Sequence, residues 1–174
     1  VKKARYLSLS TTLATNACVE GKGGRAKLVF FGVKKALVEK MRGTYGLPDP
    51  SKICFLSGDA GRDESEENRP DWEAFRREVR ESFADFDSVA LVQINPKYND
   101  GAYEKKGEEI VREELGIPCV RGYDLYQEVN VQKRGATALL NARLLPVMND
   151  FFDSIDRSLA ELGLELPVQV VKSD

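Results

Sequence analysis

The sequence predicts an α/β fold in which a mainly parallel sheet is flanked by helices and followed by a long, kinked C-terminal helix. Short apolar runs with the length of strands alternate with longer segments whose apolar residues recur at helical spacing. This alternation favours parallel strands that are joined by helical crossovers. Of the 174 residues, 42% are hydrophobic and 31% are charged, which is typical of a globular protein with its own core.

Six segments are predicted to be strands. Two of them, 27–31 and 88–94, are almost continuously apolar, as expected for strands that are buried on both faces. The complete set is 5–9, 27–31, 53–56, 88–94, 118–120 and 168–171.

The helices are predicted from apolar periodicity and from their start and stop residues. One begins at Pro70, and its buried stripe contains Trp72, Phe75, Val79 and Phe83. The others are expected at about 34–42 and 101–115, with a short helix that carries Ala14, Ala17 and Cys18 after the first strand.

The longest helix is expected from about Lys133 to Leu162. One apolar face continues along it for roughly eight turns at 3.6 residues per turn. Pro146 lies inside it, which predicts a kink or two helices that meet there. The predicted apolar face consists of Leu140, Leu144, Met148, Phe151, Ile155, Leu159 and Leu162.

The segment 57–69 contains two glycines, several acidic residues and almost no apolar side chain. We expect a mobile surface loop, because such a composition buries too little apolar area to offset the entropy of ordering the backbone. A carboxylate metal site is the alternative, since hard cations prefer oxygen ligands. We assign no metal ligands in the chain.

The composition excludes several classes of function. The chain has no histidine, so a Ser-His-Asp or Cys-His catalytic site is excluded for this chain alone. Cys18, Cys54 and Cys119 match no zinc or redox spacing, and we expect reduced, mostly buried thiols. The net charge of −2 gives no reason to expect nucleic acid or an anionic membrane as a partner.

The chain has no apolar run that is long enough to span a bilayer, and no signal-peptide core. We therefore expect a cytoplasmic protein. The chain begins on Val1 without a methionine and stops just past a strand-like run. We expect residues 1–174 to be a single α/β domain that is a fragment of a longer protein.

The junction between the first strand and the short helix is rich in polar residues. Ser10, Thr11, Thr12, Thr15 and Asn16 place four hydroxyls and one amide within seven positions. Free N–H groups at a helix start attract anions, and hydroxyls can add donors beside them. In the other interpretation, the side chains cap the helix by satisfying those same N–H groups.

Three blocks of the sequence carry a resemblance to a known family. Residues 10–17, Ser-Thr-Thr-Leu-Ala-Thr-Asn-Ala, are similar to the signature Thr-Thr-x-Ala-Thr-Asn-Ala. The second block is Asn95-Pro96, followed by Glu-Glu-Ile-Val-Arg-Glu-Glu-Leu at 108–115. The third, residues 133–148, is similar to Glu-Arg-x-x-Thr-x-x-Leu-Asn-Ala-x-Leu-x-Pro-x-Met. In these blocks the chain resembles the hydantoinase/oxoprolinase family, which includes hydantoinase A and 5-oxoprolinase-like enzymes.

The resemblance implies part of an actin-like ATPase fold, shared with Hsp70 and the sugar kinases. It further implies an ATP-dependent opener of a cyclic amide, such as a hydantoin or 5-oxoproline, that uses ATP and Mg²⁺ and often a second subunit. The acidic, glycine-rich phosphate loops of that fold do not occur within residues 1–174. We therefore expect the isolated fragment to bind neither cofactor and to be inactive. A non-catalytic α/β binding or regulatory module is the alternative.

The resemblance also marks candidate residues near the nucleotide or substrate, although it leaves the catalytic residues unknown. Leu9 and Ser10 stand where the family usually has His and Gly, so no role of that histidine carries over. For the residues on the long helix, capping and hydrogen bonding to a neighbouring loop are the alternative roles. The candidates are Thr11, Thr12, Thr15 and Asn16 at the junction, and Arg134, Thr137 and Asn141 on the first turns of the long helix.

Overall fold

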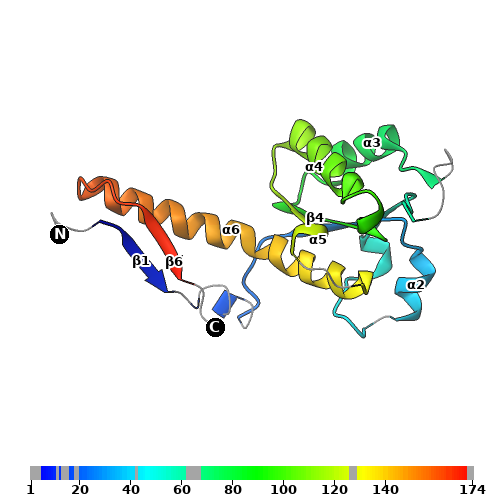
Figure 1. The fold of residues 1–174 in the computed structure, drawn as a ribbon, viewed down its shortest axis with the longest axis horizontal. Helices are drawn as coiled ribbons and strands as arrows, with labels where there is room; N and C mark the ends of the chain where they lie inside the picture. The colour runs from blue at the N-terminus through cyan, green and yellow to red at the C-terminus, as the bar shows by residue number, and fades with distance from the viewer. Residues whose placement is uncertain are drawn as a thin grey trace. The chain divides into compact units, whose positions relative to one another are not determined.

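The computed structural model describes residues 5–10, 12, 16–17, 20–41, 43–61, 68–125 and 129–171. The chain divides into two compact units, whose elements are drawn in Figure 1. The larger unit contains residues 24–143, and the smaller unit combines residues 1–23 with 144–174. The organisation of residues 1–174 as a single domain stays a prediction.

A parallel sheet with the strand order β3-β2-β4-β5 forms the centre of the larger unit. The central strands β2 (Ala26–Phe31) and β4 (Ser88–Gln93) pair along their whole length. The shorter strands β3 (Cys54–Leu56) and β5 (Cys119–Arg121) pair with β2 and β4, respectively. All of these pairings are parallel, which confirms the predicted strands and their arrangement.

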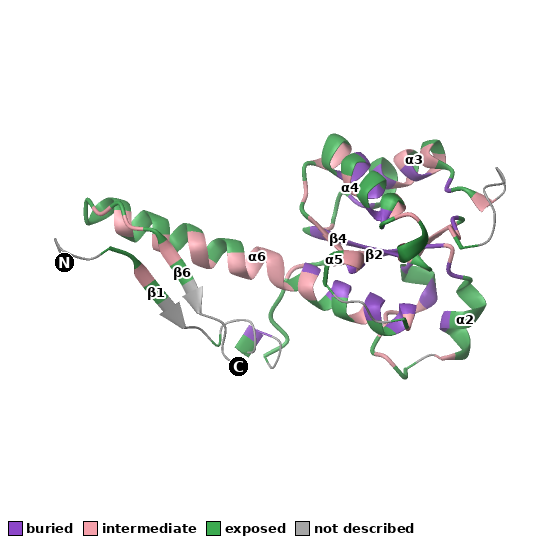
Figure 2. Cartoon of the chain, in the orientation of Figure 1, coloured by how far each residue is buried: buried purple, intermediate pink, exposed green. Residues whose placement is uncertain are grey.

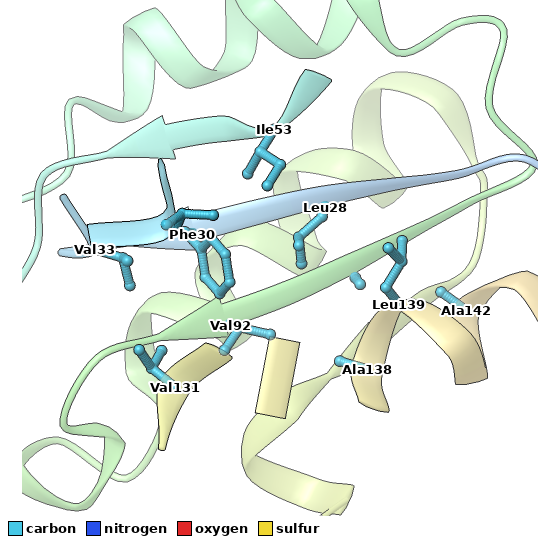
Figure 3. Packing of buried hydrophobic residues seen from close by; sticks show 11 residues of the cluster. Leu28, Phe30, Val33, Ile53, Val92, Val131, Ala138, Leu139 and Ala142 are labelled. Carbon is cyan, nitrogen blue, oxygen red and sulfur yellow. The ribbon is translucent and has the colours of Figure 1, made fainter. Parts of the chain in front are cut away.

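Alternate residues of β2 and β4 enter two hydrophobic cores, one on each face of the sheet. One core also contains residues of α2 (Lys35–Lys40) and of the first turns of α6 (Val131–Glu161). The other core contains residues of α3 (Trp72–Ser82) and α4 (Ala102–Leu115). Figure 2 shows both central strands as buried, and Figure 3 shows the core beside α6. Short helical segments complete the unit: α5 (Gly122–Leu125), η1 (Pro50–Lys52) and η3 (Pro96–Tyr98).

The helix α3 forms in the predicted region, but it begins at Trp72 and not at Pro70, because Asp71 is its N-cap. The carboxylate of Asp71 accepts a hydrogen bond from the backbone N–H of Ala74 at 2.9 Å and caps the helix. Phe75, Val79 and Phe83 are fully buried in the core below it. The predicted stripe is therefore confirmed.

Two glycines allow helices to pack closely on the aromatic rings of β2. A Cβ atom at Gly135 of α6 would lie 2.5 Å from Cζ of Phe30. A Cβ atom at Gly107 of α4 would lie 2.9 Å from Cζ of Phe31, on the other face of the sheet. Both phenylalanines are fully buried. The backbones of α4 and α6 therefore approach the sheet at distances that leave no room for a methyl group in the present packing.

The helix α6 continues through Pro146 as one element, so the prediction of two helices that meet there is wrong. Proline has no N–H and cannot donate to the carbonyl of Ala142, four residues earlier. The hydroxyl of Ser88 donates to that oxygen instead, at 2.6 Å. The next carbonyl, that of Arg143, accepts a hydrogen bond from the N–H of Gly24 at 2.8 Å. These donors from the sheet region satisfy the carbonyls that precede the proline.

The apolar face predicted for the long helix is wrong in its first half. Leu140 is 44% exposed, whereas Gly135 and Ala138 are buried. The close approach at Gly135 explains the difference, because a long side chain at that position would separate the helix from the sheet. The buried apolar residues of this half are Val131, Gly135, Ala138, Leu139 and Ala142.

In the smaller unit, β1 (Leu7–Ser10) and β6 (Val168–Val171) form a parallel pair. The C-terminal half of α6 belongs to the same unit. An apolar groove with a volume of about 520 Å³ is lined by Phe151, Ile155 and Leu159 of α6 and by Leu7 of β1. No helix in the described part of the chain has the length and apolar character that a bilayer crossing requires.

Candidate functional site

After β1, two hydrogen bonds join Thr12 and Asn16, which lie four residues apart in the sequence. The N–H of Asn16 donates to the carbonyl of Thr12 at 2.8 Å, and its side-chain Nδ2 donates to the hydroxyl oxygen of Thr12 at 3.3 Å. Both residues are exposed. The expectation that these two side chains share one face is therefore confirmed. Thr11 and Thr15 lie outside the described residues.

The Thr12–Asn16 pair can donate hydrogen bonds to a ligand. The hydroxyl oxygen of Thr12 already accepts from Asn16, so its own hydrogen is left to donate, and Nδ2 of Asn16 carries a second hydrogen. The pair also follows the carboxyl end of a parallel strand, where ligands of open α/β sheets gather. Such neutral donors suit phosphate or carbonyl oxygens, but they do not supply a general base.

The candidates on α6 belong to the larger unit, whereas Thr12 and Asn16 belong to the smaller one. Arg134 is only 2% exposed, and its guanidinium donates to the carbonyl of Gln93 at the end of β4. Nδ2 of Asn141 donates to the carbonyl of Thr137 at 2.8 Å, within the helix. These bonds run to the end of a strand and along the helix itself, so they are neither helix caps nor bonds to a neighbouring loop. A place near a nucleotide or substrate stays a prediction.

A buried carboxylate lies beside the same end of β4. Glu104, in the first turn of α4, accepts hydrogen bonds from the backbone N–H groups of Gln93 and Tyr123, each at 2.8 Å. Its side chain is fully buried. Burial raises the pKa of Glu104 to about 7, while the two N–H donors and the nearby charge of Arg134 oppose that rise. The N–H of Gln93 is thus bonded to the buried carboxylate of Glu104, and its carbonyl is bonded to the buried guanidinium of Arg134.

Sequence reasoning missed Glu104. A glutamate in the first turn of a helix, directly after a strand and a turn, is a recognisable sign of bonding to nearby backbone N–H groups. The apolar residues Tyr103, Ile110, Val111 and Leu115 of the same helix contribute to the core.

The carboxyl ends of β2, β3 and β4 enclose a hollow with a volume of about 610 Å³. The chain leaves β2 towards α2 on one face of the sheet and leaves β4 towards α4 on the other. The hollow therefore lies at the topological switch point, where open parallel sheets bind ligands. Apolar residues that include Leu37, Phe55 and Ile94 form its walls, and its polar residues are Lys34, Ser57, Asp59 and Asn68.

Asp59 is held in place by the loops around this hollow. Its Oδ1 accepts from Nδ2 of Asn95 at 2.8 Å and from the N–H of Gly61 at 3.0 Å. Its carbonyl accepts from Nδ2 of Asn68 at 2.8 Å, and its N–H donates to the Asn68 side-chain oxygen at 3.3 Å. The segment expected to be a mobile loop is therefore hydrogen-bonded at both of its described ends, whereas residues 62–67 lie outside the described part.

Two glycines form the floor of the hollow. Gly32 follows β2 with φ of +73°, and Gly58 follows β3 with φ of +124°. A Cβ atom at Gly32 would lie 2.4 Å from the carbonyl oxygen of Gly58 and 2.6 Å from Cγ2 of Ile94. Glycine after two successive strands was the sequence signal for a close meeting of loops at this edge.

Metal and thiol chemistry find little support in the described residues. Among them, no group of Cys, Asp and Glu side chains is arranged to hold a metal ion. Cys54 and Cys119 are free and partly buried, which agrees with the expectation of reduced thiols. Burial raises the pKa of each thiol to about 12, so neither is a thiolate nucleophile at neutral pH. Cys18 lies outside the described residues.

The solved structures that resemble the chain include two ATP-dependent enzymes. The crystal structure of the ATP-dependent caprolactamase from Pseudomonas jessenii matches with a TM-score of 0.74 and 23% identity, over 92% of this chain and 26% of that one. The nucleotide-free structure of acetone carboxylase, described as carrying out ATP-dependent acetone carboxylation, matches with a TM-score of 0.70 and 17% identity, over 94% of this chain and 26% of that one. The resemblance holds at the level of the fold.

These comparisons confirm the α/β fold with its parallel sheets and long C-terminal helix. They also show that this fold occurs within larger ATP-dependent enzymes, since the chain spans about a quarter of the length of each. At such identities the likeness concerns the fold alone. No family model and no curated protein matches the sequence.

Proposed function

We propose that the chain is a segment of an ATP-dependent enzyme that opens a cyclic amide, such as a hydantoin or 5-oxoproline. The observation that carries this proposal is the bonded pair of Thr12 and Asn16 at the carboxyl end of β1. It forms within the block that resembles the hydantoinase/oxoprolinase signature. The fold shared with an ATP-dependent caprolactamase supports it, because caprolactam is itself a cyclic amide.

The proposed chemistry explains why ATP is needed. Amide resonance makes the carbonyl of an unstrained lactam a poor electrophile, and ATP, when bound, supplies the phosphoryl group that activates the amide oxygen. Catalysis of such a transfer depends on oriented donors around charged oxygens. Thr12 and Asn16 are proposed to donate hydrogen bonds there. The described residues contain no carboxylate group arranged for Mg²⁺, so we propose no Mg²⁺ ligand among them.

The rest of the proposal concerns the longer protein. Its small-molecule partner is the cyclic amide, and a second subunit or domain of the same enzyme is a further partner. We propose that the protein works in the cytoplasm without nucleic acid or a membrane. The isolated chain is proposed to bind neither ATP nor Mg²⁺ and to catalyse no ring opening.

A non-catalytic α/β binding or regulatory module with the same fold is the second candidate. The contact of Arg134 favours it, because this guanidinium donates to a backbone carbonyl at the end of β4. A longer protein without ATP-dependent turnover on any cyclic amide would support this candidate.

The test uses the full-length protein with the double substitution Thr12→Val and Asn16→Leu. Ring opening of hydantoin and 5-oxoproline in the presence of ATP should fall by at least about tenfold, which corresponds to roughly 1.4 kcal/mol of lost transition-state stabilisation. The melting temperature is measured on the same protein. Thr44→Val, at an exposed threonine in the larger unit, is the matched control and should leave turnover unchanged.

A purely structural helix cap predicts the opposite pattern. The double substitution would then lower the melting temperature and leave the turnover per folded molecule unchanged. That outcome would remove the Thr12–Asn16 pair from the proposed site.

A further inference from the structure

The hollow at the switch point of the larger unit plays no part in the proposed chemistry. We propose that it binds a small aliphatic amino acid in its zwitterionic form. The ammonium group of the ligand pairs with Asp59, the carboxylate pairs with Lys34, and the aliphatic part lies against the apolar wall. This binding requires no nucleotide and does not rest on the proposed function.

The size and position of the hollow fit a small molecule. Its volume of about 610 Å³ lies within the roughly 300–1,000 Å³ that is usual for ligand pockets. It opens beyond the carboxyl ends of three parallel strands. Its floor, formed by Gly32 and Gly58, is fixed by the contact between two loops. A site with such a fixed floor is already formed before a ligand arrives, which lowers the entropy cost of binding.

Asp59 presents an oriented carboxylate to the hollow. Two hydrogen bonds hold its Oδ1, one from Asn95 and one from Gly61. Within the described residues, its Oδ2 accepts no hydrogen bond and forms no ion pair. A half-buried carboxylate with one oxygen fixed and one oxygen open is suited to an ammonium group, which offers three donors.

Lys34 supplies the opposite charge. It follows Gly32 and Val33 at the end of β2 and lines the same hollow as Asp59. In the part of the chain that the structure describes, its ammonium has neither a carboxylate nor a carbonyl partner. A ligand carboxylate can therefore approach it without displacing an existing ion pair.

The same hollow is also lined by apolar residues. Leu37 is 42% exposed and lines the hollow, so it offers apolar surface that a ligand can cover. Phe55 and Ile94 extend the wall with partly buried side chains. An aliphatic chain of a few carbons would cover this surface.

The same features argue against other ligands. A phosphate group would meet the carboxylate of Asp59, with one lysine to offset the repulsion. A purely apolar molecule would bury both charges without partners, which is costly. A ligand that carries both charges avoids both penalties.

Two sources could supply such a ligand. Opening a lactam such as 5-oxoproline produces an amine and a carboxylate in one molecule, so a ring-opened lactam belongs to this class, and so does a free α-amino acid. 6-Aminohexanoic acid represents the first source and leucine the second. The tighter binder of the two identifies the source.

The experiment titrates each probe into the ¹⁵N-labelled 174-residue chain, without nucleotide, and follows backbone amide shifts. We expect saturable shifts at Gly32, Gly58 and Ile94, with a dissociation constant of about 1 mM or tighter for the better probe. Hexanoic acid and hexylamine are matched controls, each lacking one of the two charges. Each should bind at least about tenfold more weakly.

Two substitutions assign the charges. Asp59→Asn keeps an oxygen for the bonds from Asn95 and Gly61 but removes the charge, and it should weaken the better probe by about tenfold or more. Lys34→Met should weaken that probe and hexanoic acid, while leaving hexylamine unaffected. The proposal is overturned if no saturable shift occurs at these amides, or if hexylamine or hexanoic acid binds as tightly as the zwitterion. Unchanged binding by a folded Asp59→Asn variant would also overturn it. Because the assay contains no ATP and measures no turnover, its failure leaves the proposed function untouched.

Discussion

Replacing Gly135 by alanine should destabilise the protein, although a helix interior normally favours alanine. Helix propensity alone predicts a gain of about 1 kcal/mol. The structure predicts a larger loss, because the new Cβ would lie 2.5 Å from Cζ and 2.8 Å from Cε1 of Phe30. Phe30 cannot easily move, since it is fully buried and its ring contacts that of Phe55 with 6.0 Å between centroids.

The magnitude follows from these opposing contributions. Inserting a methyl group into a well-packed core costs about 1–3 kcal/mol, and in this tight contact the upper part of that range applies. After the gain in propensity, we expect the free energy of unfolding to fall by about 1–2 kcal/mol. For a domain of this length the melting temperature would fall by roughly 2–8 °C.

Urea unfolding of the 174-residue chain, followed by circular dichroism, measures the effect. Ala160→Gly, at an exposed position in the last turn of the same helix, is the control for propensity and should cost less than about 1 kcal/mol. Adding Phe30→Leu to Gly135→Ala should give a smaller loss than the sum of the single losses, because the shorter side chain relieves the contact. A Gly135→Ala variant that is more stable than the wild type would refute the close packing of α6 on the sheet.

Two further predictions concern buried polar groups. Ser88→Ala leaves the buried carbonyl of Ala142 without its donor and should lower the free energy of unfolding by about 1–3 kcal/mol. The control Ser154→Ala removes an exposed hydroxyl that is bonded to a carbonyl of its own helix, and it should cost less than about 0.5 kcal/mol. Equal urea midpoints for the two variants would contradict the account of Pro146. Glu104 has a higher pKa in the folded protein than in the unfolded chain, so its contribution to stability is fully present below about pH 4.5 and is lost as the pH rises to about 7. The free energy of unfolding, measured relative to Glu104→Gln, should therefore fall by roughly 3 kcal/mol over this range, and a difference that is constant with pH would exclude the raised pKa.

Much of the fold could be predicted because its signals are local. The apolar runs that form β2 and β4 indicate strands buried on both faces, and the stripe of α3 is complete within twelve residues. The orientation of α6 could not be predicted in the same way. Its leucines have helical spacing, but the side that faces the sheet was decided by the close approach at Gly135.

The candidate sites also differ in whether their contacts are local in the sequence. The bond between Thr12 and Asn16 joins residues four apart, so helical geometry predicts it directly. Asp59 is bonded to Asn95, 36 residues away, and Glu104 is bonded to the end of β4 and to α5. The proximity of such groups can be predicted only when the order of strands in the sheet is known. Their local sequence, an acidic loop and a helix start, has several other common explanations.

The most direct test of the proposed function is ATP-dependent ring opening by the full-length protein. The rate of ring opening is compared between the wild type and the Thr12→Val, Asn16→Leu double variant. The proposal predicts that the wild type opens hydantoin or 5-oxoproline when ATP is present, and that a folded double variant is at least about tenfold slower. Failure of the wild type to open these rings, or equal rates for two folded proteins, would contradict it.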